Sequence, residues 1–240
     1  MVVPAAGIGR RLGAGGAKAL AQLAGRALLA HAVGAMEANR CTTAVVVVAH
    51  PDAMEATAKL LADEGFAKVT AVVAGGPTRQ ANVAAGLRAL PQGPGYVAVH
   101  DAARPLAAPG AVDRMLGLLL EAGVAGVVPG VPVVDTIRRV DPARRSTGIV
   151  DRQQLRTTQT PQLFAREVLE AAHRLARRDG VEAVDDAALV ELAGHRVQVV
   201  PGDPDNLKVT TPLDLAVAET LLARRHPARR HPEEPEEPLR

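Results

Sequence analysis

Short runs of β-branched residues alternate along the chain with longer segments rich in alanine and leucine, and this alternation constrains the fold more than any other feature. In the segment 109–121, apolar residues from Val112 to Leu119 recur at i, i+3, i+4 and i+7, which is the spacing of one helix face. Strands that alternate with helices over short connections predict βαβ units and a mostly parallel sheet flanked by helices. We predict strands at 2–4, 43–49, 68–74, 96–100 and 123–128, and helices at 27–38, 52–64, 78–90 and 109–121.

The pattern changes after Pro129. The segment 132–157 alternates polar and apolar residues, contains several arginines and has no helical stripe, which predicts a projecting β-arm. Regular elements then resume, and we predict helices at 165–179, 186–193 and 212–223 and a strand at 196–200. We therefore expect one α/β domain over residues 1–223 with a single excursion.

The last segment, 224–240, has a different composition. It holds five arginines, four glutamates and four prolines. Proline at this density cannot continue a helix, and the segment has too few apolar residues to bury. We expect a disordered, charged tail.

Composition excludes several classes of partner. Only three residues are aromatic, which argues against a platform that stacks single-stranded nucleic acid. The formal net charge of +2 is too small to indicate a nucleic-acid or membrane partner. No apolar run approaches the roughly 20 residues that a membrane span needs, and no secretory leader is visible. Cys41 is the single cysteine, which fits a reducing compartment, so we expect a cytoplasmic protein.

A glycine-rich segment, 4–18, follows the first predicted strand and also carries Arg11 and Lys18. Glycines let the backbone approach a ligand closely, and consecutive N–H groups can surround a phosphate. The segment is not a dinucleotide fingerprint, because Leu12 stands where the third glycine would be. It is not a P-loop either, because Lys18 is followed by Ala19. We interpret it as a cationic phosphate-binding loop of another type.

Other polar residues follow the later strands, where open α/β sheets bind ligands. Asp101 could hold Mg²⁺ or could cap the next helix. Asn82 could read a base edge with its amide or could simply belong to the first turn of a helix. Arg152 and Lys208, taken singly, are typical surface charges, and His100 is more typical of a buried core histidine. No Cys/His pair has metal-ligand spacing, and no Gly-x-Ser-x-Gly nucleophile elbow is present.

Eight short motifs occur in the order of one known family. They are PAAGIGRR, GGPTRQANV, HDAARP, PVVDTI, VDR, TPQLF, VDDAALVE and DNLKVT. With them, residues 2 to about 222 resemble the 2-C-methyl-D-erythritol 4-phosphate cytidylyltransferases of the non-mevalonate isoprenoid pathway. The resemblance implies a Rossmann-like nucleotidyltransferase fold and a homodimer in which each β-arm reaches the partner subunit.

The resemblance also implies a role for individual residues in binding CTP. Arg11 and Lys18 would bind the phosphates and stabilise the transition state, and Asp101 would lie near the substrate and a divalent cation, Mg²⁺. The nucleotide-binding residues, several acting through their backbone, would be Ala5, Ala6, Gly7, Gly9, Gly76, Asn82 and Asp101.

The acceptor, a polyol phosphate, would be bound from two sides. Thr136 and Arg152 on the arm would reach the acceptor in the partner's site, and Lys208 would position its phosphate. The implied reaction is in-line attack of a phosphate oxygen on the α-phosphorus of CTP, with pyrophosphate as the leaving group. The attacking phosphate is already ionised, so no general base is needed, and catalysis consists of positioning and charge stabilisation.

The chain departs from the family pattern at three places. Ala17 and Ala19 flank the loop lysine where the family usually has Pro and Gln. Asn82 replaces a usual Ser, and Val184 replaces a common Thr. None of these changes removes a charged group that the chemistry needs.

Two alternative functions remain open on the sequence alone. One keeps the chemistry and changes the acceptor to another polyol phosphate, such as ribitol 5-phosphate. The other is a nucleotide-binding regulator that has lost catalysis, although retention of the loop cations argues against it. An NAD-dependent enzyme is excluded by the absence of the dinucleotide fingerprint.

Overall fold

The structure is a computed structural model that describes residues 1–9, 12 and 16–225 of the 240-residue chain. Within the described residues the strands are β1 (Val2–Ala5), β2 (Gln22–Leu23), β3 (Arg26–Ala27), β4 (Val45–Ala49), β5 (Val69–Ala74), β6 (Tyr96–Val99), β7 (Gly126–Pro132), β8 (Ile137–Val140), β9 (Ser146–Val150), β10 (Arg156–Thr158), β11 (Gln162–Ala165) and β12 (Val197–Pro201). The helices are α1 (Leu28–Glu37), α2 (Met54–Asp63), α3 (Arg79–Ala89), α4 (Ala111–Ala122), α5 (Arg166–Asp179), α6 (Asp186–Leu192) and α7 (Pro212–Arg225), with short 3₁₀ turns η2 (Lys18–Leu20), η3 (Pro51–Ala53) and η4 (Arg152–Gln154).

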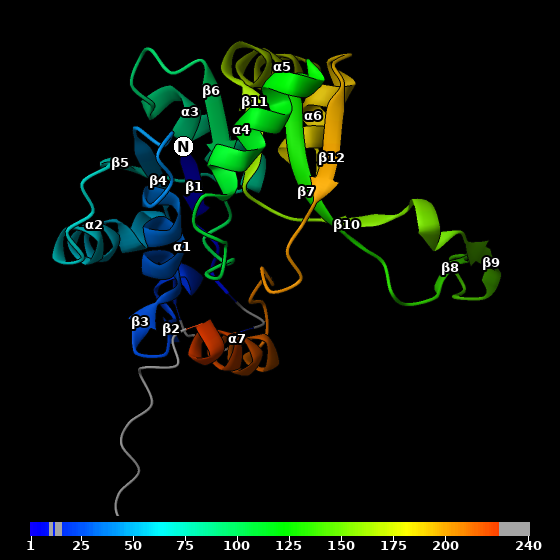
Figure 1. The fold of residues 1–240 in the computed structure, drawn as a ribbon, viewed down its shortest axis with the longest axis horizontal. Coiled ribbons are helices and arrows are strands. Elements are labelled where there is room, and N and C mark those ends of the chain that lie inside the picture. The colour runs from blue at the N-terminus through cyan, green and yellow to red at the C-terminus, as the bar shows by residue number, and fades with distance from the viewer. Residues whose placement is uncertain (10–11, 13–15, 226–240) are drawn as a thin grey trace, which may run out of the picture.

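The main sheet has the strand order β10-β7-β11-β6-β1-β4-β5, with β12 paired to β7. Strands β6, β1, β4 and β5 are parallel neighbours, and β12 is parallel to β7. Strands β10 and β11 run antiparallel to the strands that they pair with. The predicted α/β fold with a mostly parallel sheet flanked by helices is confirmed (Figure 1).

The core lies on both faces of this sheet because successive side chains of a strand point to opposite faces. Val45 and Val47 of β4 pack in one cluster with residues of α1 and α4. Val46 and Val48 pack in the other cluster with residues of α3, α5 and α6. All four valines are fully buried, which explains why the strand reads as a continuous apolar run.

The largest difference from the sequence prediction lies between 156 and 165. Strand β11 was missed, and it separates β6 from β7. It has four residues, and the first of them, Gln162, is polar although it is buried, so its pattern is not that of an apolar strand. The predicted strand at 123–128 begins later and extends to Pro132, because β7 continues along β10 to the base of the arm.

The predicted β-arm is present as a hairpin of β8 and β9 that projects from the sheet (Figure 1). The terminal helix α7 ends at Arg225, two residues beyond the prediction. The disordered tail was expected at 224–240, but Arg224 and Arg225 belong to α7, so the prediction is wrong for these two residues; the rest of that segment, 226–240, lies outside the described residues. None of the described helices has the length and apolar content that crossing a membrane requires.

Gly86 allows α3 to approach the sheet closely. A Cβ atom there would overlap Cγ1 of Val2 and lie 3.1 Å from Cγ2 of Val48. We therefore expect Gly86→Ala to lower the free energy of unfolding by about 1–3 kcal/mol, the usual cost of overpacking. Gly117 of α4 is the matched control, since a Cβ there would meet nothing within 4 Å, and Gly117→Ala should stabilise the helix slightly. Urea unfolding of both variants checks this, and equal changes in stability would contradict it.

Candidate active site

A cavity of about 400 Å³ opens at the carboxyl ends of the parallel strands. Because β1, β5 and β6 are parallel, the segments that follow them meet at one edge of the sheet. Eight of the sequence-predicted site residues line this cavity: Ala5, Ala6, Gly7, Lys18, Gly76, Asn82, Asp101 and Lys208. Residues from four separate parts of the chain are thus brought together.

A backbone hydrogen bond joins Lys18 to Gly7 near the start of the glycine-rich segment, and Lys18 lines the cavity. The N–H of Lys18 donates to the carbonyl of Gly7 over 3.0 Å. Gly9 has a φ of +59°, and a Cβ atom on it would lie 2.7 Å from Cβ of Lys18, so both its backbone and its packing require glycine. Arg11, the other predicted catalytic cation, lies outside the described residues.

The turn after β5 is held by Asn82 of α3, and Thr78 caps the start of that helix. Oδ1 of Asn82 accepts the N–H of Gly76 over 2.7 Å, and Oγ1 of Thr78 caps the helix by accepting the N–H of Ala81 over 3.1 Å. Asn82 is 8% exposed and lines the cavity. Its carbonyl oxygen is used to position the turn, so the amide NH₂ is the group it has left for a ligand.

Asp101 follows β6 and forms two ion pairs. Its carboxylate accepts from Nε of Arg79 over 3.1 Å and from Nζ of Lys208 over 2.7 Å. Burial alone would raise the pKa of Asp101, but the positive charges of Arg79 and Lys208 outweigh it and hold that pKa well below the usual range. Asp101 is therefore ionised at neutral pH, and the alternative role of a helix cap is wrong, because the next helix, α4, begins at Ala111 and its N-cap residue is Gly110.

The neighbouring His100 is a core residue, as the sequence indicated. It is fully buried, with Nδ1 at 3.2 Å from Oγ1 of Thr160 and Nε2 at 3.1 Å from the carbonyl of Arg104. Burial lowers its pKa to about 4, so it is neutral near pH 7. The hydroxyl of Thr160 also accepts the N–H of Asp101 over 2.9 Å, which fixes the backbone that carries the carboxylate.

The loop that carries Lys208 is tied to the same region. Nδ2 of Asn206 donates to the carbonyl of Thr160 over 2.8 Å, and Nη1 of Arg104 donates to the carbonyl of Asn206 over 2.7 Å. Nη2 of Arg104 also reaches the carbonyl of Thr158 over 3.2 Å. These bonds explain how the motifs HDAARP, TPQLF and DNLKVT, far apart in the sequence, come to act at one place.

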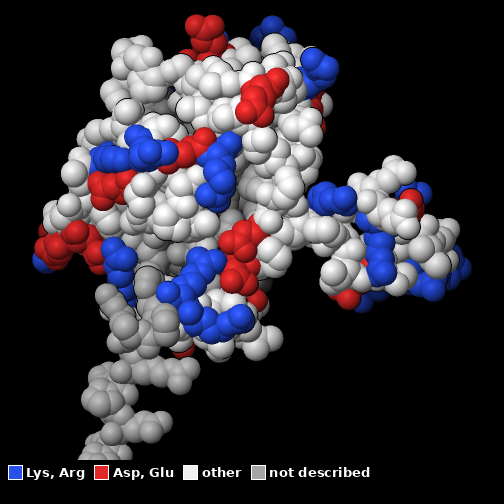
Figure 2. Space-filling view, viewed as in Figure 1, with Lys and Arg blue, Asp and Glu red and all other residues white. Residues whose placement is uncertain are grey.

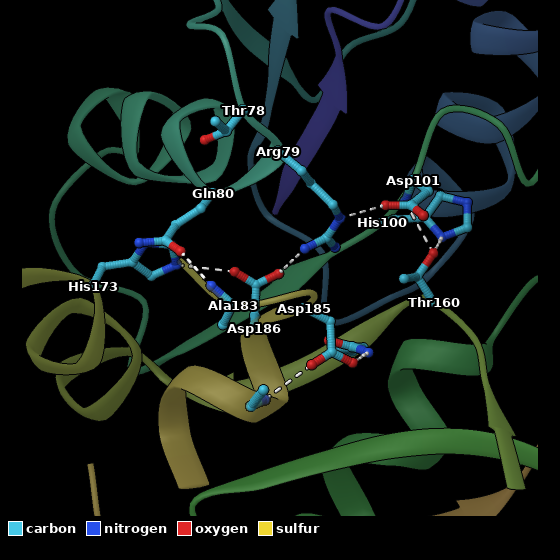
Figure 3. A network of polar contacts seen from close by, with 12 residues as sticks. Thr78, Arg79, Gln80, His100, Asp101, Thr160, His173, Ala183, Asp185 and Asp186 are labelled. Carbon is cyan, nitrogen blue, oxygen red and sulfur yellow. Dashed lines mark hydrogen bonds and ion pairs between the residues drawn. The ribbon is translucent and has the colours of Figure 1, made fainter. Parts of the chain in front are cut away.

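Arg79 is the site residue to which sequence reasoning assigned no role. It lines the cavity and donates from Nη1 to Asp186 over 2.7 Å as well as from Nε to Asp101 (Figure 3). Burial opposes its charge, but the carboxylates of Asp186 and Asp101 outweigh this effect and raise its pKa. Its position in the first turn of a helix, next to a glycine pair, is the sequence signal that could have identified it.

Thr136 and Arg152 lie on the arm and do not line the cavity of their own chain. Both are exposed, and Arg152 makes a hydrogen bond from Nη1 to the carbonyl of Val134. Figure 2 shows the arm standing away from the body of the molecule with basic side chains on its surface. Val184, the departure next to the Asp185–Asp186 pair, is 90% exposed.

The described residues do not form a protein-built metal site. None of their histidine, cysteine and carboxylate side chains cluster in a group of three or more that could hold a metal ion. Asp101 is the one acidic residue among the described residues that line the cavity, and both its oxygens already face cations. Within the described lining, Asp101 is therefore the one carboxylate that could bind a metal, and the other ligands of that metal would come from elsewhere.

Cations outnumber carboxylates in the cavity. Its described lining contains Lys18, Arg79 and Lys208 against one carboxylate, and the backbone of residues 5–7 lies between them. Such a set suits a ligand that carries several phosphate charges, because lysine and arginine bind phosphate oxygens and glycines admit them to the backbone. The lining offers charge stabilisation rather than a nucleophile activated by a neighbouring base.

Comparison with known proteins identifies relatives over almost the whole chain. A family model described as "IspD: 2-C-methyl-D-erythritol 4-phosphate cytidylyltransferase" matches residues 1–224. A protein of that name from Streptomyces coelicolor is 46% identical over 232 residues, which cover 93% of this chain and 84% of the relative. One from Synechocystis is 40% identical and covers 94% of this chain and 97% of the relative. The solved structure of the Thermus thermophilus protein of the same name has a TM-score of 0.75 at 36% identity, covering 93% of this chain and 98% of that one.

Proposed function

The chain belongs to the 2-C-methyl-D-erythritol 4-phosphate cytidylyltransferase family, and we propose from this that the cavity at the sheet edge is where it joins its two substrates. The enzyme transfers CMP from CTP to 2-C-methyl-D-erythritol 4-phosphate, releases pyrophosphate and forms 4-diphosphocytidyl-2-C-methyl-D-erythritol in the non-mevalonate isoprenoid pathway. The proposal that the reaction takes place in this cavity rests on one observation: Lys18, Asp101 and Lys208 all line it.

In this proposal the glycine-rich loop binds the triphosphate. The backbone of Ala5, Ala6, Gly7 and Gly9 surrounds the nucleotide, and Lys18 together with Arg11 contacts its phosphates. These cations stabilise the charge that develops as the bond to pyrophosphate breaks. Support comes from the orientation of Lys18 into the cavity and from the close contact of its side chain with Gly9.

The cytosine lies beside the turn at 75–82. Gly76 and Asn82 contact it, and the geometry limits what Asn82 can offer. Its carbonyl oxygen already accepts the N–H of Gly76, so its NH₂ donates to an acceptor on the base. An amide here can therefore replace the hydroxyl of the usual serine, which also donates a hydrogen bond.

The acceptor lies beside Asp101 and Lys208. Lys208 holds the phosphate of the acceptor, and Asp101 orients the polyol while remaining ionised. A phosphate oxygen of the acceptor then attacks the α-phosphorus in line with the leaving pyrophosphate. No side chain has to remove a proton, because the second pKa of a phosphate monoester is about 6.

A divalent cation, Mg²⁺, accompanies the nucleotide in this proposal. Most of its ligands would be phosphate oxygens and water, as is usual for Mg²⁺, and Asp101 is the carboxylate placed to approach it. When bound, the cation offsets the mutual repulsion of the phosphate oxygens.

We also propose that the arm at 132–157 exchanges between two subunits of a homodimer. Thr136 and Arg152 would then complete the partner's acceptor site. Support comes from the exposure of apolar arm residues, since Val134 is 78% exposed and Ile149 is 67% exposed in the single chain. Apolar side chains left uncovered on a projecting hairpin are typical of an interface.

We place the enzyme in the cytoplasm. Its single cysteine, Cys41, is exposed and unpaired, and a reducing compartment keeps such thiols free.

Acceptor choice is tested by comparing 2-C-methyl-D-erythritol 4-phosphate with ribitol 5-phosphate at fixed CTP and Mg²⁺. We expect kcat/KM to be at least about tenfold higher for the methylerythritol phosphate, which corresponds to about 1.4 kcal/mol of transition-state binding. Preference for ribitol 5-phosphate would assign the chain to the other acceptor. Tight CTP binding with no turnover on either acceptor would favour the other alternative, a nucleotide-binding regulator that has lost catalysis.

A further inference from the structure

A chain of ion-paired groups leads from the active site into the helices on one face of the sheet, and every member except the exposed Lys208 is at least partly buried (Figure 3). It begins at Lys208 and Asp101 in the cavity and continues through Arg79 of α3 to Asp186 of α6. It ends at His173 of α5, whose Nε2 lies 2.9 Å from Oδ1 of Asp186. The last two members, Asp186 and His173, do not line the cavity.

Asp186 is the most deeply buried member. Its side chain is 1% exposed, compared with 11% for Asp101 and 26% for Arg79. A carboxylate in that position is costly unless it is paired and hydrogen-bonded. Both of its oxygens are used, Oδ2 by Arg79 and Oδ1 by His173, so the group is fixed in one orientation.

His173 holds the carboxylate of Asp186 in place by donating a hydrogen bond to it. A carboxylate only accepts hydrogen bonds, so Nε2 of His173 must donate to Asp186. Its Nδ1 is buried and has no hydrogen-bond partner among the described residues. One ring nitrogen of His173 is therefore buried without a partner, a cost that the bond to Asp186 has to offset.

Arg79 connects the fixed carboxylate of Asp186 to Asp101 in the cavity. Its guanidinium is planar and rigid, so fixing Nη1 on Asp186 also fixes the direction in which Nε meets Asp101. Asp101 in turn binds Lys208, the cation placed on the acceptor phosphate. If Asp186 were absent, Arg79 would keep a single carboxylate partner and could rotate, and the orientation of Asp101 would change with it.

We propose that Asp186, held by His173, is a positioning residue for cytidylyl transfer that acts through Arg79 on Asp101. The inference rests on the proposed function, since it concerns the same acceptor site. It predicts a specific pattern: loss of Asp186 impairs use of the acceptor and leaves CTP binding intact.

The main test compares Asp186→Asn with Asp185→Asn. Asp185 is a matched control because it is the adjacent residue and its carboxylate binds Ala188 and Gln162, outside the chain of charges. We expect Asp186→Asn to lower kcat/KM for the acceptor about 100-fold, the size of effect that a small misplacement of reacting groups produces. CTP affinity, measured by calorimetry, should change less than about twofold in both variants, and Asp185→Asn should keep near wild-type turnover.

A double-mutant cycle separates positioning from a general loss of structure. If Asp186 acts through Arg79 on Asp101, Asp186→Asn should cost little further turnover once Asp101→Asn is present. Independent, multiplying losses would overturn the proposal. So would equal losses in CTP affinity and acceptor use.

His173 provides a second route if Asp186→Asn folds poorly. His173→Gln keeps a donor for Asp186 and should retain most turnover, whereas His173→Leu should lose acceptor use in the same way as Asp186→Asn. Equal activity of the two His173 variants would contradict the proposal. Wild-type turnover is measured alongside. If the wild type is active and the variants are unaffected, only this inference is overturned. If the wild type shows no turnover, the proposed function is overturned as well.

Discussion

Replacing Lys18 with alanine should lower kcat about 10²–10³-fold, the usual cost of removing one group that stabilises transition-state charge. Lys18 is the last residue of the glycine-rich segment and lines the cavity where the triphosphate is proposed to bind. CTP binding should weaken far less than turnover, because the charge on the bridging oxygen develops only as pyrophosphate leaves. Steady-state kinetics with calorimetric CTP titration measures both quantities.

Lys59→Ala is the matched control for that change. Lys59 lies on the exposed face of α2 and pairs only with Asp63, one turn away, so its removal should leave turnover unchanged. If Lys18→Ala reduced CTP affinity and turnover by the same factor, Lys18 would bind the ground state without contributing to catalysis.

Mixing an Arg152→Ala chain with a Lys18→Ala chain should restore activity that neither has alone. If each site takes Lys18 from one subunit and Arg152 from the other, a mixed dimer contains one intact site. With random exchange, half the dimers are mixed, and total activity should reach about a quarter of the wild-type value. The measurement is turnover after the two variants are dissociated together and reassembled, with dimer composition followed by native mass spectrometry.

The control for this experiment is each variant taken through the same treatment alone. Neither should gain activity, because neither homodimer contains a site with both residues. Mixed dimers that are demonstrated by mass yet remain inactive would mean that the arm serves its own subunit or lies outside the site.

Much of the fold follows from local patterns that the sequence displays. The βαβ alternation, the arm at 132–157 and the placement of the glycine-rich loop at a strand end were all predicted and are present. These features depend on the spacing of neighbouring residues. Strand β11 was missed because its four residues are placed by pairing with β6 and β7, a tertiary property that its own sequence does not encode.

The site likewise has features that local sequence patterns predict and features that depend on tertiary packing. The residues of the glycine-rich segment and of the strand ends were candidates from the sequence itself, whereas the role of Lys208 came from the resemblance to the family; eight of the predicted site residues line one cavity. The partners of Asp101 could not be predicted, since Lys208 lies 107 positions away from it. Arg79 and Asp186 are also 107 positions apart, and only the packing of α3 against α5 and of α5 against α6 brings them together. Charges that depend on such packing are not visible in any local motif.

The most direct test of the account follows the α-phosphate of CTP. Wild-type enzyme is given CTP labelled at the α-phosphorus, Mg²⁺ and 2-C-methyl-D-erythritol 4-phosphate, and label in the diphosphate product is counted against pyrophosphate released. We predict one labelled product for each pyrophosphate and no release when the acceptor is omitted. Pyrophosphate released at the same rate without acceptor, or label left entirely in CTP, would contradict the central claim that this cavity joins CTP to the acceptor phosphate.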